Sequence, residues 1–243
     1  MRNVLLALSL AVFAVSTGAN AQDNKDHKDH SNKPRIEGSG NMVTKDVAVK
    51  SFDELNVQGV FSVLLTQGSK EEVKIEADDN LQELFEVKNE GSKLSINTRK
   101  DVNYTSKKKL KVYITFKKLK SMELKTVGDI SSDANLNFDD LKISNKSVGS
   151  IDLKMTAQNL NVENKSVGNV KLNGKAQNAV IRNKGVGSVQ AASFIVQKMD
   201  IENDGVGSAE VNAAQELKVK DSFLGKVTNK GAAPVKRLKK VEI

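Results

Sequence analysis

The chain has 243 residues, a formal net charge of +8, no cysteine and only two histidines, His27 and His30. Without a thiol it can use no cysteine nucleophile, disulfide or cysteine-linked lipid anchor. Because both histidines precede the part that we expect to fold, histidine-based catalysis is excluded there as well. The positive charge is spread over short lysine clusters without interleaved aromatic residues. This pattern is typical of solvated strand edges and disfavours a nucleic-acid partner.

Residues 1–21 have the pattern of an export signal. Arg2 provides a positive start, residues 4–15 form an apolar run, and Ala19-Asn20-Ala21 is a small-x-small cleavage site. The run is short for a bilayer span, so a retained anchor is the less favoured alternative. We therefore expect an exported mature chain without a transmembrane segment, in the periplasm, on the outer surface or secreted.

Residues 22–33 contain no apolar side chain and predict a disordered polar linker. His27 and His30 lie in this segment beside Asp26 and Asp29, so an ordered linker could bind a transition metal weakly. Because a flexible segment would first have to become ordered, we expect neither a metal nor a cofactor.

From residue 34 onward, short apolar segments alternate with turn residues, which predicts strands. We expect a strand–turn–strand unit over residues 52–68, with Gly59 at a bulge or tight corner. Asp78, Asp79 and Asn80 predict the start of a brief helical turn. Further short strands are expected over residues 42–49, 73–76, 85–88, 94–97, 110–116 and 122–124.

The second half repeats one short pattern around a glycine. The glycines are Gly128, Gly149, Gly168, Gly187, Gly207 and Gly225, spaced by 21, 19, 19, 20 and 18 residues. This period is too short for a helical hairpin repeat and fits one coil of a β-solenoid. We predict one all-β, parallel solenoid domain over residues 34–243, with coils of about 19 residues over roughly 119–230. Its N-terminal part is expected to be less regular, and residues 231–243 are the candidate cap.

Three sets of residues occupy fixed places in these repeats. We expect the valines to lie in register and to point inward: Val148, Val167, Val186 and Val206. We expect the asparagines to form a ladder between coils about 4.8 Å apart: Asn145, Asn164, Asn183 and Asn203, with Asp221 in the last coil. We expect the glycines to supply left-handed or bulged backbone: Gly149, Gly168, Gly187 and Gly207. All are interpreted as structural positions.

The opening Gly38-Ser39-Gly40-Asn41, residues 52–68 and the repeats of Val-Gly-Ser-Ile type together resemble the auto-transporter adhesin head GIN domain family. That family is a domain of unknown function common in Bacteroidetes, and the resemblance covers roughly residues 36–227. It implies a right-handed parallel β-solenoid-like fold, export and an adhesive role. No single motif within it carries chemistry.

Candidate ligand contacts are few. Tyr104 with Lys107, Lys108 and Lys109 forms the least implausible set, and Tyr113, on their other side, lies in a strand where it can belong to the core. Phe223 is interpreted as part of a coil corner or as a local contact.

Acidic residues show no convergent pair of the kind that glycan cleavage needs. The adjacent pairs are Asp78-Asp79, Glu71-Glu72 and Asp139-Asp140, and within a strand their members would point to opposite faces.

We therefore predict a non-enzymatic exported envelope protein that acts as an adhesin-like binding module. Its candidate partners are a glycan, an anionic envelope component or another envelope protein. The alternatives are a carbohydrate-active β-helix enzyme, such as a polysaccharide lyase or hydrolase, and an envelope-stress or signalling accessory protein.

Overall fold

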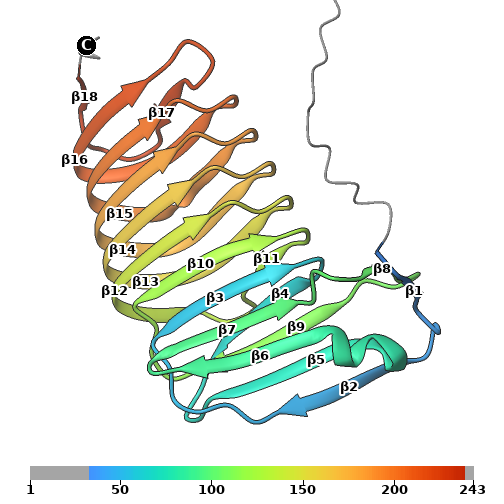
Figure 1. Ribbon diagram of the computed structural model, residues 1–243. Coiled ribbons are helices and arrows are strands. Elements are labelled where there is room, and N and C mark those ends of the chain that lie inside the picture. Colours follow the sequence, from blue (N-terminus) through green and yellow to red (C-terminus); the bar gives the residue numbers. More distant parts are fainter. Residues whose placement is uncertain (1–32, 239–243) are drawn as a thin grey trace, which may run out of the picture. The chain divides into compact units, whose positions relative to one another are not determined.

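A computed structural model describes residues 33–238. The expected export signal, the linker up to residue 32 and the last five residues of the chain lie outside the described residues. Within residues 33–238 the structure is almost entirely β and forms a solenoid of about six turns, as predicted (Figure 1). No helix in this part of the chain is long and apolar enough to cross a membrane.

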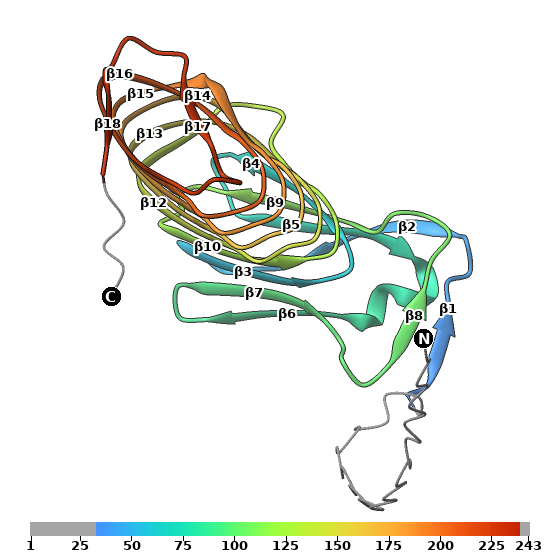
Figure 2. The same ribbon diagram turned by 90° about the horizontal axis from the view of Figure 1, so that it is seen from above.

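The regular part of the solenoid consists of five long strands stacked in parallel. They are β12 (Leu136–Asn145), β13 (Ile151–Asn164), β14 (Val170–Asn183), β15 (Val189–Asn203) and β16 (Ala209–Asp221). Each strand bends midway, and a short turn then leads to the next coil, so that the coils nest when viewed along the stack (Figure 2). The register is direct, with Ile151 opposite Val170 and Asn164 opposite Asn183. A repeat of constant length therefore places equivalent residues in columns.

The first coils are built from shorter strands. The chain enters the stack through β3 (Glu54–Gly59) and β4 (Ser62–Gln67), and returns to it through β10 (Ser121–Thr126) and β11 (Ile130–Ser131). Strand β10 pairs with β3 and β12, whereas β11 pairs with β4 and β13. These two rows form the two faces of the solenoid.

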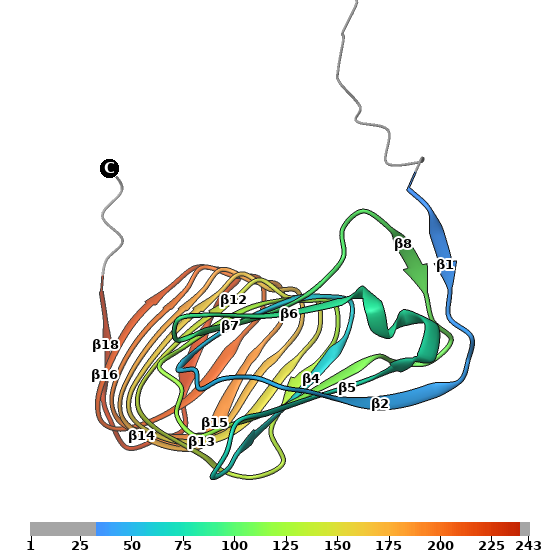
Figure 3. The same ribbon diagram turned by 60° about the horizontal axis from the view of Figure 1, so that its bottom comes forward.

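The segment between β4 and β10 makes the N-terminal half irregular (Figure 3). It contains β5 (Glu72–Asp78), the 3-10 helix η2 (Asp79–Leu84), β6 (Phe85–Glu90), β7 (Lys93–Thr98), β8 (Asn103–Thr105) and β9 (Lys111–Phe116). Strands β7 and β9 extend the two faces in parallel, but β6, β5 and β2 (Met42–Val47) then add antiparallel. The predicted helical turn is thus present as η2.

At the other end of the stack, two short strands pair with the last long one. Strands β17 (Val227–Asn229) and β18 (Val235–Arg237) both lie parallel to β16, with Leu217 opposite Val235. The Leu238 amide also donates to the Val219 carbonyl at 2.9 Å. These contacts occupy part of the edge that β16 would otherwise expose.

The core is a continuous column of inward-facing aliphatic residues, widened by Phe61, Phe116 and Phe194. Along β13 the buried positions alternate up to Ala157, shift at the bend, and alternate again from Leu160. Period-two burial on both faces is what a thin solenoid core requires.

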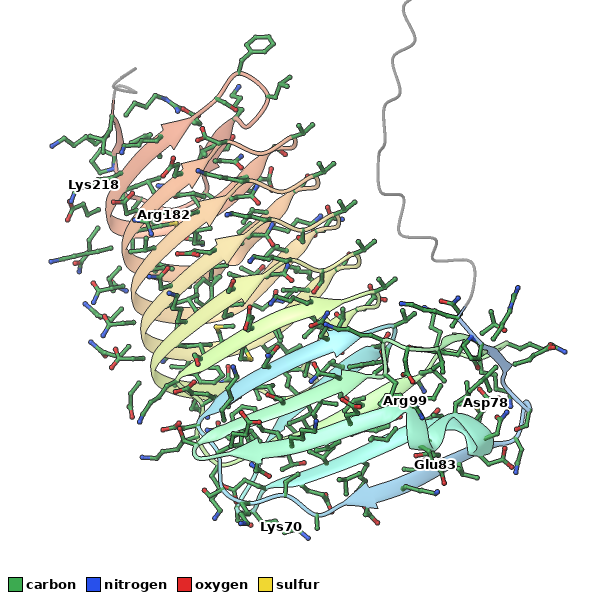
Figure 4. All side chains as sticks on the ribbon, viewed as in Figure 1. Lys70, Asp78, Glu83, Arg99, Arg182 and Lys218 are labelled. Carbon is green, nitrogen blue, oxygen red and sulfur yellow. The ribbon has the colours of Figure 1, made fainter. Side chains whose placement is uncertain are left out.

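The buried carboxylate of Asp78 ties the opening glycines to the N-terminal half. It accepts hydrogen bonds from the Gly40 amide at 2.6 Å and from the Ser106 hydroxyl. Figure 4 shows Asp78 beside η2. A Cβ atom on Gly38 would lie 2.7 Å from this carboxylate. Strand β1 (Arg35–Glu37) pairs with β8, and Ser106 follows β8 directly. The strand pairing and the Asp78 carboxylate therefore both hold this segment in place.

Candidate functional site

The asparagine column forms a buried ladder. Asn145 Nδ2 donates to Asn164 Oδ1 at 2.7 Å, Asn164 Nδ2 donates to Asn183 Oδ1 at 2.7 Å, and Asn183 Nδ2 donates to Asn203 Oδ1 at 2.6 Å. All four side chains are at most 3% exposed. Because their amides bond to one another inside the core, the ladder is structural and presents no group to a ligand.

The ladder ends on backbone. Asp221 lies opposite Asn203 in register, as expected. However, Asn203 Nδ2 donates to the carbonyls of Gly225 at 2.6 Å and Gly207 at 3.0 Å. The Asp221 carboxylate instead accepts from the Val227 amide at 3.1 Å and pairs with Arg237. The last coil therefore satisfies the ladder without another amide side chain.

The glycine column sharpens the turns between coils. Gly149, Gly168, Gly187 and Gly207 have φ angles of +137°, +137°, +128° and +131°. Each lies directly over the glycine of the neighbouring coil, and a Cβ atom on Gly168 would approach the Gly149 carbonyl oxygen to 2.2 Å. Only glycine combines this conformation with such close stacking.

The valines of the repeats point outward, so the prediction that they face the core is wrong. They are in register, because Val148, Val167, Val186 and Val206 are joined by successive parallel bridges. Yet their side chains are 52%, 53%, 52% and 52% exposed. The alternation of side chains along the backbone explains this orientation. Asn164 and Ser166 point inward and are buried, so the next residue, Val167, points outward.

This column continues beyond the four repeats. Val60 and Val127, 52% and 51% exposed, occupy the same place in the first two coils, since the Val127 amide donates to the Gly59 carbonyl at 2.8 Å. At the far end, the Gly207 amide donates to the Leu224 carbonyl at 3.1 Å. The Gly187 amide makes the equivalent bond to the Val206 carbonyl at 2.9 Å, so Leu224 occupies the valine position in the last coil. We call the resulting row the apolar ridge: Val60, Val127, Val148, Val167, Val186, Val206 and Leu224, with Phe223 beside its end.

The ridge follows the turns that stack along one edge of the solenoid (Figures 1 and 4). Phe223, in the turn between β16 and β17, is 99% exposed and Leu224 is 61% exposed. Phe223 thus lies in a coil corner as expected but makes no local contact that buries its ring. A continuous exposed apolar row of this kind marks an interaction site more often than scattered apolar residues do.

Polar columns flank the ridge. On one side, two residues before the valines of the three middle coils, lie the exposed lysines Lys146, Lys165 and Lys184. Within the described part of the chain, none of these three lysines forms an ion pair. On the other side, Ser150 and Ser188 amides are tied to the preceding coil by Asp129 at 3.0 Å and Asn169 at 2.9 Å. The three middle coils therefore place an exposed lysine on one side of the ridge.

A pocket of about 380 Å³ lies at the foot of the ridge. Its lining includes Val60, Phe61, Leu110 and Val127 together with Tyr104, Lys108 and Lys109. The Tyr104 hydroxyl is buried and has no hydrogen-bond partner among the described residues. Of the four candidate ligand contacts, the structure brings Tyr104, Lys108 and Lys109 together around this pocket. Lys107 is exposed nearby and does not line it.

A separate polar cluster lies on the face formed by β5 and β9. The Tyr113 hydroxyl donates to Glu76, and Lys111 Nζ lies 3.1 Å from Glu76 Oε1. The Tyr113 hydrogen bond and then the Lys111 charge lower the pKa of Glu76 below its ordinary value of 4.5. The same hydrogen bond raises the pKa of Tyr113. Tyr113 is therefore a half-buried partner of Glu76, outside the hydrophobic core.

Acid should destabilise the protein partly through Glu76. Because folding favours its ionised form, the stabilisation is complete above its ordinary pKa of 4.5 and is lost as pH falls through its lower folded value. We expect Glu76→Gln to flatten the fall of melting temperature with pH below about 4.5. Thermal melts of both proteins across this range measure the effect, and parallel curves would contradict it.

The adjacent acidic residues do not assemble a catalytic pair. Asp78 is buried at the end of β5, whereas Asp79 is exposed at the start of η2. Asp139 and Asp140 are both exposed, contrary to the expectation, because the strand bends there and the pairing register skips Asp139. Asp140 accepts from Asn159 Nδ2 at 2.7 Å. Within residues 33–238, no three acidic or histidine side chains gather as a metal site would require.

Comparison with known proteins identifies the family. The model of the family described as "Putative auto-transporter adhesin, head GIN domain" matches residues 51–233. The chain belongs to this family. The resemblance seen in the sequence is thereby confirmed, and the matched range contains both the irregular half and the repeats of this head GIN domain.

Solved structures agree with this membership. A crystal structure of a "putative adhesin" from Bacteroides fragilis is 30% identical, with a TM-score of 0.72, and the match covers 84% of this chain and 100% of that one. A "putative adhesin" from Parabacteroides distasonis is 19% identical, with a TM-score of 0.60, over 84% of this chain and 95% of that one. A "putative lipid binding protein" from the same organism is 18% identical, with the same TM-score and coverage. The latter two show the shared fold alone. Among curated proteins no match was found.

The apolar ridge was not among the candidate sites predicted from the sequence. The signal was present, because counting by two from Leu160 and Val162 reaches Asn164 and Ser166 and leaves Val167 on the outer face. The ridge was not predicted because all four repeated valines were expected in the core.

Proposed function

We propose that this head GIN protein is a non-enzymatic, exported, adhesin-like binding module whose binding edge is the apolar ridge with the pocket at its foot. The observation that carries the proposal is the ridge itself, an unbroken exposed row of aliphatic side chains in a protein whose core is otherwise well buried. The names of its family and of its relative from Bacteroides fragilis support an adhesive role.

The stacking explains how such a site is kept rigid. The turn that carries Val167 is bonded on both sides. The Val167 amide and carbonyl bond to Ser147 and Gly149 of the preceding coil at 3.0 and 2.8 Å, whereas the flanking Ser166 carbonyl and Gly168 amide each bond to Val186 of the next coil at 2.8 Å. A rigid surface loses little conformational entropy on binding.

The test is a binding array of glycans, envelope lipids and envelope proteins, probed with the mature chain from residue 22 onward. Release of reducing ends from each glycan is followed in parallel. We expect binding without turnover, and we expect the double change Val148→Ser with Val186→Ser to weaken it. Cleavage of any glycan, or binding that ignores the ridge variant, would overturn the proposal.

A further inference from the structure

The partner of the apolar ridge can be inferred from its shape, and this inference rests on the proposed function. The ridge is one residue wide and follows the edge formed by the stacked turns. A stable protein interface needs about 800 Å² from each partner, which two convex ridges meeting along a line cannot bury. A fluid lipid interface instead moulds itself around a narrow ridge, so that every side chain of the row can be buried.

The backbone of the ridge is compatible with a medium of low polarity. The Gly149 amide donates to the Val167 carbonyl at 2.8 Å, and the Gly168 amide donates to the Val186 carbonyl at 2.8 Å. Because the turns bond to one another along the stack, entry into the headgroup region leaves these groups paired. The same bonds leave no free strand edge at the ridge to which a partner strand could add.

The flanking charges indicate which kind of lipid surface would bind. Lys146, Lys165 and Lys184 form a column beside the valines, and Lys108 and Lys109 stand at the pocket at the foot of the ridge. The lysine position is not filled by lysine at the two ends of the ridge, where Gln58 precedes Val60, Asp204 precedes Val206 and Ser222 precedes Leu224. Positive side chains beside an apolar row match anionic headgroups above an acyl layer.

We propose that the apolar ridge docks this protein onto an anionic lipid surface. The valines, Leu224 and Phe223 enter the boundary between headgroups and acyl chains, while the lysine column contacts lipid phosphates. Phe223 and Leu224 are the most exposed of these residues, so each contributes more buried apolar area than any single valine.

The chain has no tryptophan, which allows a direct optical test. Phe223→Trp places a single fluorophore on the ridge. Ile195→Trp is the matched control, because Ile195 is 48% exposed on β15 and outside the ridge. With vesicles of phosphatidylcholine containing about one third phosphatidylglycerol, we expect the emission of the Phe223→Trp protein to shift to the blue. The emission of the Ile195→Trp protein should stay unchanged.

Co-sedimentation of the mature chain with the same vesicles measures the energetics. Joint Phe223→Ser and Leu224→Ser changes should weaken binding about tenfold, and Val167→Ser about threefold. Ile195→Ser should have no effect, and all these variants should keep the wild-type melting temperature because the altered side chains are exposed. Joint Lys146→Gln, Lys165→Gln and Lys184→Gln changes should reduce the preference for anionic over pure phosphatidylcholine vesicles and the loss of binding at high salt.

Absence of a blue shift at position 223, an equal shift at position 195, or vesicle binding unaffected by the ridge changes would each overturn the lipid proposal. If the ridge variants lose a glycan or protein partner on the array while vesicles do not bind, the lipid inference fails and the proposed function stands. If the ridge variants change no binding of any kind, both fail.

Discussion

Replacing Gly168 by alanine should destabilise the protein by about 3 kcal/mol or more. Gly168 has a φ of +137°, and an added Cβ would lie 2.2 Å from the Gly149 carbonyl oxygen. The backbone of the coil below cannot yield as a flexible side chain would, so two stacked coils must separate. Chemical denaturation of the wild type and the Gly168→Ala variant measures the loss.

Gly91→Ala is the comparison variant without a clash, at a left-handed position that residues other than glycine can adopt. Gly91 also has a positive φ, +60°, but nothing lies within 4 Å of the Cβ position. We expect it to cost only about 1 kcal/mol, the usual cost of a left-handed residue other than glycine. Equal losses for the two variants would show that coil-to-coil contact at the glycine column contributes nothing.

Asn164→Ala should cost about 3 kcal/mol, because it leaves a buried donor on Asn145 without its partner and leaves Asn183 Oδ1 with only the Gly185 amide, at 3.3 Å. The Ser166 hydroxyl, which donates to Asn164 Oδ1 at 2.8 Å, also loses its acceptor. The site is only 3% exposed, so water cannot replace these bonds without entering the core.

Asn159→Ala is the matched control on the same strand. Asn159 forms an equivalent ladder, donating to Asp140 Oδ1 at 2.7 Å and accepting from Asn178 Nδ2 at 2.8 Å, but it is exposed. Water can satisfy the groups it leaves, so we expect a loss below about 1 kcal/mol. If the denaturation midpoints of the Asn164→Ala and Asn159→Ala proteins fall equally, burial is not what makes the inner ladder stabilising.

The ridge shows that residue type alone does not predict which side chains of a repeat are buried. Valine is most often a core residue, and four valines at a constant period were therefore assigned to the core. The assignment ignored that asparagine and serine take the inward positions at this corner, where Asn164 and Ser166 are buried. Asparagine can occupy the core here because the neighbouring coil has an asparagine at the same position, and the two side-chain amides hydrogen-bond to each other.

Only some of the residues that line the pocket could be predicted from the sequence. Tyr104, Lys108 and Lys109 are close in the sequence and were singled out together. Their neighbours Val60 and Val127 come from turns far away in the chain, brought beside them because β3 and β10 pair in parallel. No local pattern records that pairing, because a long segment separates the two strands.

By itself, the sequence determined the solenoid, the coil length, the family and the stacking of the asparagine and glycine columns. A short period repeated with its turn residues permits only one kind of stacking, since equivalent residues must fall one above another. Tertiary structure alone decided how the ladder ends on the Gly225 carbonyl, and that the valines join Leu224 in one exposed row. These depend on the packing of one coil against the next, a relation between distant residues that the pattern within one repeat does not contain.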